Sequence, residues 1–125
     1  MSNKTILIVA HEDNSRRSLA DVFFEEEYAV STASSGEEGL EMLMKEQPSV
    51  AIIDQGLWEM DGMRTLSRFK EIRPETQVIM LTGHGTIDTA FAAAKMGAFA
   101  YIVKPPELAH LVNTVKRALD ATKSS

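Results

Sequence analysis

Four short, almost uninterrupted apolar runs constrain the fold of this chain more than any other feature. They occupy residues 6–9, 50–53, 78–81 and 101–103. Runs of this length that are rich in β-branched side chains are typical of strands buried on both faces, as in parallel sheets. A fifth and more mixed run, residues 28–33, predicts an edge strand.

Segments with helical spacing separate these runs. Their apolar stripes are Leu19, Val22 and Phe23; Leu40, Leu43 and Met44; Met63, Leu66 and Phe69; Ile87, Ala90, Phe91 and Ala94; and Leu111, Val112, Val115 and Leu119. Strand and helix therefore alternate five times, a pattern that requires right-handed crossovers. We predict a single α/β domain over residues 1–125, in which five helices cover both faces of a doubly wound, five-stranded parallel sheet in three layers.

Local signals mark the expected ends of the helices. Ser35 and Glu38 form a capping-box sequence before the second helix. The other predicted boundaries are N-caps at Asp61 and Thr86, a first helical residue at Pro106, helix stops at Pro48 and Pro74, and a left-handed helix end at Gly97.

Composition excludes several functional classes. The chain has 125 residues, no cysteine and a formal net charge of -5, with no cluster of lysine or arginine. The lack of cysteine rules out disulfides, thiolate metal sites and a cysteine nucleophile, and the charge argues against direct binding of nucleic acid. Because the first apolar run is too short for a signal peptide or a membrane span, we expect a cytoplasmic protein with no membrane partner.

Reactive side chains follow three of the predicted strands. Asp54 ends the third strand, Thr82 ends the fourth, and Lys104 follows the fifth. In an open parallel sheet, ligands bind outside the carboxyl ends of the strands, so a carboxylate, a hydroxyl and an ammonium group are expected at one rim.

These residues belong to an ordered series of motifs. The series comprises Ile52-Ile53-Asp54, Met60-Asp61-Gly62, Met80-Leu81-Thr82-Gly83, Gly97-Ala98 and Tyr101-Ile102-Val103-Lys104-Pro105. From Lys4 to about Ala121, the chain resembles the receiver domain of bacterial two-component response regulators, the chemotaxis-regulator-like fold. The resemblance implies the strand order 2-1-3-4-5. Residues 82–90 further resemble receivers attached to sigma-54-dependent transcriptional activators.

The resemblance implies a phosphorelay reaction. Asp54 would be the nucleophile that takes a phosphoryl group from a phosphohistidine of a sensor histidine kinase, and Lys104 and Thr82 would each contact a phosphoryl oxygen. The metal expected in the family is Mg²⁺, with Asp54 and the backbone carbonyl of Gly56 among its ligands.

The resemblance also implies a conformational switch. Tyr101 would be an aromatic switch that follows the movement of Thr82, and the Lys104–Pro105 peptide bond is a cis candidate. The face formed by the fourth helix, the fifth strand and the fifth helix would bind an output domain or a second copy of the chain.

The sequence departs from the family where metal is bound. The acidic pair that family members carry after the first strand falls on Ala10 and His11. Glu12 is a doubtful substitute, because its side chain should point away from the place of His11. His11 is expected to be a solvated strand-end residue, with a metal-ligand role or a hydrogen bond to Asp54 as alternatives. Mg²⁺ binding is therefore expected to be weak or absent.

Two further positions differ from the family pattern. Trp58 stands where the family usually has proline, and Glu27 stands where a helix-ending glycine is common.

Three functions compete for this sequence: a phosphate-accepting receiver with impaired metal binding, a pseudo-receiver that only binds partners, and a small flavin or metal protein. A flavin site would require a Ser/Thr/Gly-rich loop after the first strand, which residues 10–13 do not provide.

Overall fold

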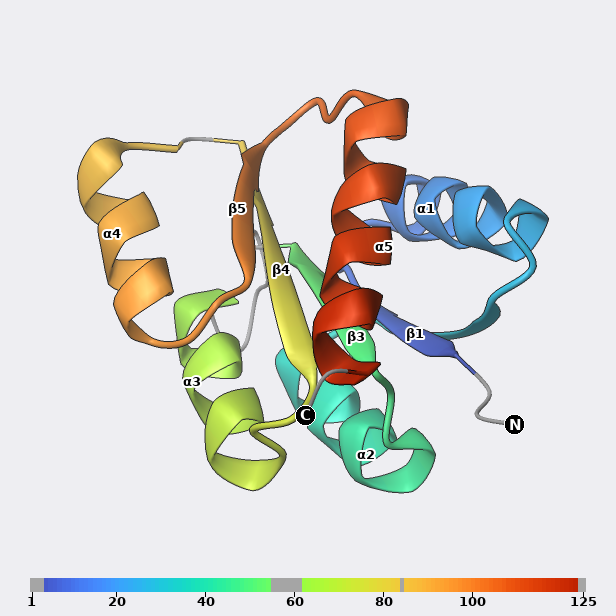
Figure 1. The fold of residues 1–125 in the computed structure, drawn as a ribbon, viewed down its shortest axis with the longest axis horizontal. Helices are drawn as coiled ribbons and strands as arrows, with labels where there is room; N and C mark the ends of the chain where they lie inside the picture. Colours follow the sequence, from blue (N-terminus) through green and yellow to red (C-terminus); the bar gives the residue numbers. More distant parts are fainter. Residues whose placement is uncertain (1–3, 55–61, 84, 124–125) are drawn as a thin grey trace.

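The computed structural model describes residues 4–54, 62–83 and 85–123, and within these residues it forms one five-stranded parallel sheet with five helices. The elements are β1 (Thr5–Val9), α1 (Asp13–Glu25), β2 (Ala29–Ala33), α2 (Gly36–Glu46), β3 (Val50–Asp54), α3 (Gly62–Ile72), β4 (Gln77–Thr82), α4 (Ile87–Lys95), β5 (Ala100–Val103) and α5 (Leu108–Lys123). The strand order is β2-β1-β3-β4-β5, which confirms the predicted fold class (Figure 1).

The sheet separates two apolar cores. Alternate residues of each central strand face opposite sides, so that Ile6 and Ile8 pack toward α1 and α5, whereas Leu7 and Val9 pack toward α2 and α3. All four of these side chains are fully buried. Burial on both faces explains why the central strands have no polar interruption.

The two edge strands differ in how well the sequence predicted them. β2 lies at one edge, as its mixed composition indicated. β5 lies at the other edge, so the expectation that residues 101–103 are buried on both faces is wrong. Val103 is 52% exposed there. An apolar run therefore predicts a strand but does not show whether both faces of that strand are buried.

Several predicted helix ends are confirmed. The Thr86 side chain accepts a hydrogen bond from the Thr89 amide and caps α4. Gly97 has a φ of 102° at the end of the same helix, and Glu27 adopts the left-handed conformation with a φ of 69° after α1.

Two predicted helix ends are wrong in detail. Ser35 caps α2 by accepting from the Glu38 amide, but the Glu38 carboxylate binds Ser34 and not Ser35, so the capping box is incomplete. Helix α5 begins at Leu108, two residues after Pro106, because the first helical hydrogen bond runs from the Leu111 amide to the Glu107 carbonyl. Asp61 lies outside the described residues.

Some of the predicted apolar stripes face solvent. Met44 is 57% exposed on α2, while Ile87 and Phe91 on α4 are 88% and 65% exposed. Within α4, Ala93 is the buried residue. The predicted stripe of α4 therefore lies mainly outside the core, and its apolar surface is presented outward.

Candidate functional site

The carboxyl ends of three strands bring the predicted reactive side chains to one rim. Asp54 is the last residue of β3 and pairs in register with Leu81 of β4. Thr82 ends β4, and its carbonyl accepts a 2.7 Å hydrogen bond from the Lys104 amide. Asp54 and Thr82 are 6% and 5% exposed. This geometry follows directly from parallel pairing, which aligns the ends of neighbouring strands.

Lys104 binds the carboxylate of Asp54 through both oxygens. Its Nζ atom lies 3.0 Å from Oδ1 and 2.9 Å from Oδ2. The Asp54 side chain is 9% exposed and that of Lys104 is 34% exposed. A buried charged group is usually paired with an opposite charge, and Lys104 is the partner of Asp54. The peptide bond from Lys104 to Pro105 is cis, as predicted.

A cleft opens beside this ion pair. Its volume is about 270 Å³, and α1 contributes Asn14, Ser15 and Ser18 to its wall, opposite Asp54 and Lys104. The ion pair is therefore reachable from solvent between α1 and the segment that leads into α5.

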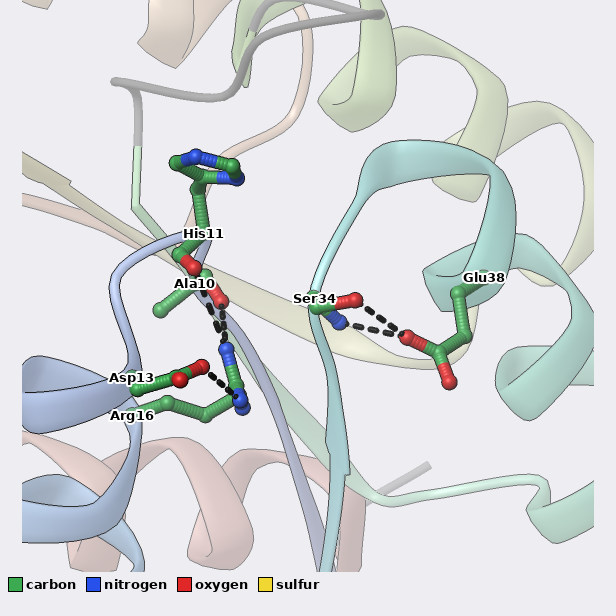
Figure 2. A network of polar contacts seen from close by, with 6 residues as sticks. All are labelled: Ala10, His11, Asp13, Arg16, Ser34 and Glu38. Carbon is green, nitrogen blue, oxygen red and sulfur yellow. Dashed lines mark hydrogen bonds and ion pairs between the residues drawn. The ribbon is translucent and has the colours of Figure 1, made fainter.

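The end of β1 offers backbone carbonyls and no acidic pair. Ala10 is fully buried and its methyl side chain offers no ligand atom, while His11 is exposed. Arg16 Nη1 donates to the carbonyls of both residues, at 2.9 and 3.2 Å, and its Nη2 pairs with Asp13. Figure 2 shows the His11 imidazole pointing away from this guanidinium. The sequence analysis missed Arg16, although the spacing from Asp13 to Arg16 is that of a helical ion pair.

The Glu12 side chain forms a hydrogen bond with the first turn of α1. Its Oε1 accepts a 2.9 Å hydrogen bond from the Ser15 hydroxyl in the first turn of α1. Ser15 also lines the cleft beside Asp54 and Lys104, and the expectation that Glu12 points away from the place of His11 stays a prediction.

A second set of polar contacts holds the end of β2. The Glu38 carboxylate accepts from the Ser34 amide at 2.6 Å and from the Ser34 hydroxyl at 2.9 Å (Figure 2). These two bonds, the amide bond first, lower the pKa of Glu38 below its ordinary value, with a small contribution from Arg16. The end of β2 is thereby tied to α2 beside the Ala10 backbone.

Part of the predicted Mg²⁺ site lies among the described residues. Mg²⁺ requires octahedral oxygen coordination, usually with at least one freely available carboxylate. Within the described part of the chain, no three His, Asp or Glu side chains cluster as metal ligands, and both oxygens of Asp54 bind Lys104. Gly56 and Trp58 lie outside the described residues, so their predicted roles stay predictions.

Tyr101 lies against α4. Its hydroxyl oxygen is 2.7 Å from Oγ1 of Thr89, and its side chain packs against the core on the α2 and α3 side of the sheet. A Cβ atom built on Gly85 would lie 3.4 Å from both the Tyr101 ring and the Thr82 methyl group. Thr82 and Tyr101 therefore flank the same glycine. The sequence analysis did not single out Thr89 as a partner of Tyr101.

The family model for the response regulator receiver domain matches residues 6–116. The chain belongs to this family. Its receiver domain is 36% identical over 114 residues to the regulatory protein AtoC of Escherichia coli strain K12, an alignment that covers 91% of this chain and 25% of AtoC. This chain thus spans about a quarter of the length of that relative.

Solved structures agree with this assignment. The receiver domain has a TM-score of 0.93 and 31% identity to a CheY-like response regulator receiver domain protein of Methanospirillum hungatei JF-1, with 98% of each chain covered. The TM-score to the beryllofluoride-activated NtrC4 receiver domain dimer is 0.89 at 31% identity, with 95% of this chain and 98% of that chain covered. Among its described helices, none has the length and apolarity needed to cross a membrane.

Proposed function

We propose that this receiver domain accepts a phosphoryl group on Asp54 from a phosphohistidine of a sensor histidine kinase. A carboxylate oxygen of Asp54 forms the new bond to phosphorus, while the phosphorus–nitrogen bond of the donor breaks and the imidazole leaves. The observation that carries the proposal is the buried Asp54 carboxylate held by Lys104 at a rim that also contains Thr82. Phosphoryl transfer depends mainly on positioning and charge neutralisation, which these groups supply.

Metal binding at this site is proposed to be weak or absent. Ala10 and His11 supply no carboxylate, Glu12 binds Ser15, and Lys104 binds both oxygens of Asp54. An incoming ion would share the Asp54 carboxylate with the Lys104 ammonium group and would gain no carboxylate from Ala10 or His11. Transfer to Asp54 is accordingly expected to be slow.

The partner surface is proposed to be the face of α4, β5 and α5. Ile87, Phe91, Val103 and Leu108 are each at least 52% exposed on these elements. Exposed apolar residues of this size favour a protein partner, either an output domain or a second copy of the chain. Similar receivers occur in the regulatory protein AtoC and form a dimer in the beryllofluoride-activated NtrC4 receiver domain.

A pseudo-receiver that binds partners without phosphorylation is the second candidate. It is favoured by one observation, the engagement of both Asp54 oxygens by Lys104 without an acidic pair at the end of β1. In that case the partner surface would stay in a single state.

The deciding experiment is incubation with a small phosphodonor, with and without Mg²⁺, followed by intact-mass measurement. The wild-type chain should gain one phosphoryl group slowly and with little dependence on Mg²⁺, and the Asp54→Asn variant should gain none. The double variant Ala10→Asp with His11→Asp should react faster in Mg²⁺ by at least about tenfold, equivalent to about 1.4 kcal/mol of barrier.

Each outcome separates the two functions. If neither the wild type nor the double variant gains mass, the pseudo-receiver is the correct assignment. If the wild type already reacts fast and only in Mg²⁺, the proposal of impaired metal binding is wrong.

A further inference from the structure

A hydroxyl-to-hydroxyl contact joins the edge strand to the first turn of α4. Tyr101 Oη on β5 lies 2.7 Å from Thr89 Oγ1 on α4. Thr89 belongs to the N-terminal capping box of that helix, together with Thr86. The side chain that the sequence marks as a switch is therefore bonded to the cap of the helix next to it.

The Thr89 hydroxyl is shared between Tyr101 and the backbone and side chain of Thr86. The Thr89 hydroxyl accepts from the Thr86 amide at 3.1 Å, and it lies 3.1 Å from the Thr86 carbonyl and 3.0 Å from the Thr86 hydroxyl. A threonine hydroxyl has one proton and two lone pairs. Either hydroxyl can therefore donate in the Tyr101–Thr89 bond, because Thr89 can offer its single proton to Tyr101 or to Thr86.

Close packing of the preceding loop supports the same arrangement. A Cβ atom on Gly85 would lie 2.7 Å from Val103 Cγ2 on β5, closer than real side chains approach. The backbone at Gly85 is thus pressed onto β5 beside the Tyr101 ring.

Helix α4 has little else to hold its N-terminal half. Ile87 and Phe91 are mostly exposed, and the buried residue of the helix, Ala93, lies in its second half. A helix with so little buried apolar surface opens locally at low cost, so a single hydrogen bond at its first turn has a large effect on its position.

We propose that Thr89 is a positioning residue that holds Tyr101 inward, and that the Tyr101–Thr89 hydrogen bond fixes the N-terminal turn of α4 on β5. Breaking this bond releases the turn that carries Ile87 and so changes the exposed apolar surface. The proposal rests on the proposed function only in that this surface is the one expected to bind a partner. A ligand or modification that favours the state without the Tyr101–Thr89 hydrogen bond would raise the population of that state.

The test combines two variants that remove one hydroxyl each. Tyr101→Phe leaves the Thr86–Thr89 capping box intact, and Thr89→Val leaves the tyrosine intact. Amide hydrogen exchange is measured at Thr89 and Ala90, whose amides bind the hydroxyl and the carbonyl of Thr86. Tyr101→Phe should speed exchange at both amides about two- to tenfold, the range expected for one hydrogen bond.

A spectroscopic reading distinguishes positioning from a loss of helix stability. The chain has two tyrosines, so fluorotyrosine labelling gives two fluorine signals that the Tyr28→Phe variant assigns. The Tyr101 signal should move in Thr89→Val and return in Thr89→Ser, which restores the hydroxyl. A double-mutant cycle compares the changes in the free energy of unfolding. The effect of Thr89→Val should be non-additive with that of Tyr101→Phe and additive with that of Tyr28→Phe.

Either of two results would overturn the proposal. One is unchanged amide exchange in Tyr101→Phe, and the other is an unmoved Tyr101 signal in Thr89→Val. No step of the experiment uses a phosphodonor, so a failure of Asp54 to accept phosphoryl leaves these results unaffected.

Discussion

At the scale of single residues, the bond between Lys104 and Asp54 governs the chemistry of the rim. Each oxygen of the carboxylate accepts from Nζ and keeps a second lone pair. In the proposed reaction, one oxygen would form the bond to phosphorus while the ammonium group stays close. Lys104 would then neutralise the negative charge that develops during transfer.

Glu27 carries local backbone strain. It ends α1 in a Schellman motif, in which the Tyr28 amide binds the Phe23 carbonyl and the Glu27 amide binds the Phe24 carbonyl. Because its φ of 69° disfavours a side chain, Glu27→Gly should raise the free energy of unfolding by about 0.5–1 kcal/mol in denaturant titrations.

The matched control for Glu27→Gly is Glu26→Gly. Glu26 has a φ of -82°, so glycine brings no relief there and should lower stability. Equal destabilisation by both variants would contradict the role assigned to the left-handed backbone.

Glu38 should make stability depend on acid pH. Its pKa is lowered in the folded state, so its contribution is present above the ordinary value of 4.5 and is lost as the pH falls through the folded value. Glu38→Gln should therefore lower the free energy of unfolding by about 0.5 kcal/mol near neutral pH, with the difference from wild type shrinking below pH 4.5.

The control for Glu38→Gln is Glu37→Gln, which removes the same formal charge from the same turn of α2. Stability of both variants is followed by denaturant titration across the acid range. A Glu38→Gln deficit that stays constant with pH would show that the Ser34 contacts do not depend on the carboxylate charge.

At the scale of elements, α4 is the helix that combines a complete N-terminal cap with little burial. Its first turn is fixed by Thr86, Thr89 and Tyr101, whereas Ile87 and Phe91 face outward. Helices with a fully buried stripe, such as α5 with Leu111 and Val115, gain their position from apolar packing instead. The placement of α4 is therefore controlled by a few polar contacts and by the loop that precedes it.

Two glycines in that loop provide a matched pair. Gly85→Ala places a Cβ atom 2.7 Å from Val103 Cγ2, so it should lower the free energy of unfolding by about 1–3 kcal/mol. At Gly83 an added Cβ atom meets nothing within 4 Å, so Gly83→Ala should change stability by less than about 0.5 kcal/mol. Thermal unfolding of the two variants measures the difference, and equal effects would contradict the close approach of the loop to β5.

At the scale of the whole molecule, stability without metal is expected to be close to stability with it. A ligand raises stability only by binding to the folded state, and Mg²⁺ binding is proposed to be weak because Ala10 and His11 supply no carboxylate. A large excess of Mg²⁺ should therefore shift the melting temperature by no more than about 1–2 °C.

The variant Ala10→Asp with His11→Asp serves as the positive control for the Mg²⁺ titration. Its restored carboxylates should give a clear rise in melting temperature with Mg²⁺. Zn²⁺ and Ni²⁺ test whether His11 and Asp54 form a different metal site, since imidazole suits these ions. A large rise for the wild type in Mg²⁺ would show that impaired metal binding is the wrong interpretation.

The sequence pattern by itself determined the fold class and the side chains that follow the strands, whereas the strand order came from the family resemblance. Alternating apolar runs and helical stripes specify parallel strands joined by helices, and the strand ends then place Asp54, Thr82 and Lys104 together. These features could be predicted because they depend on periodicity and on the residue that follows a strand, both of which are properties of a short stretch of chain.

Only the tertiary structure decided which surfaces are covered and which polar groups meet. Helical spacing marked Ile87 and Phe91 as apolar without showing that both side chains are mostly exposed. Likewise, Arg16 reaches the carbonyls of Ala10 and His11, and Tyr101 reaches Thr89, across gaps between separate elements. The position of one element relative to another sets such distances, and local sequence patterns carry no information about that position.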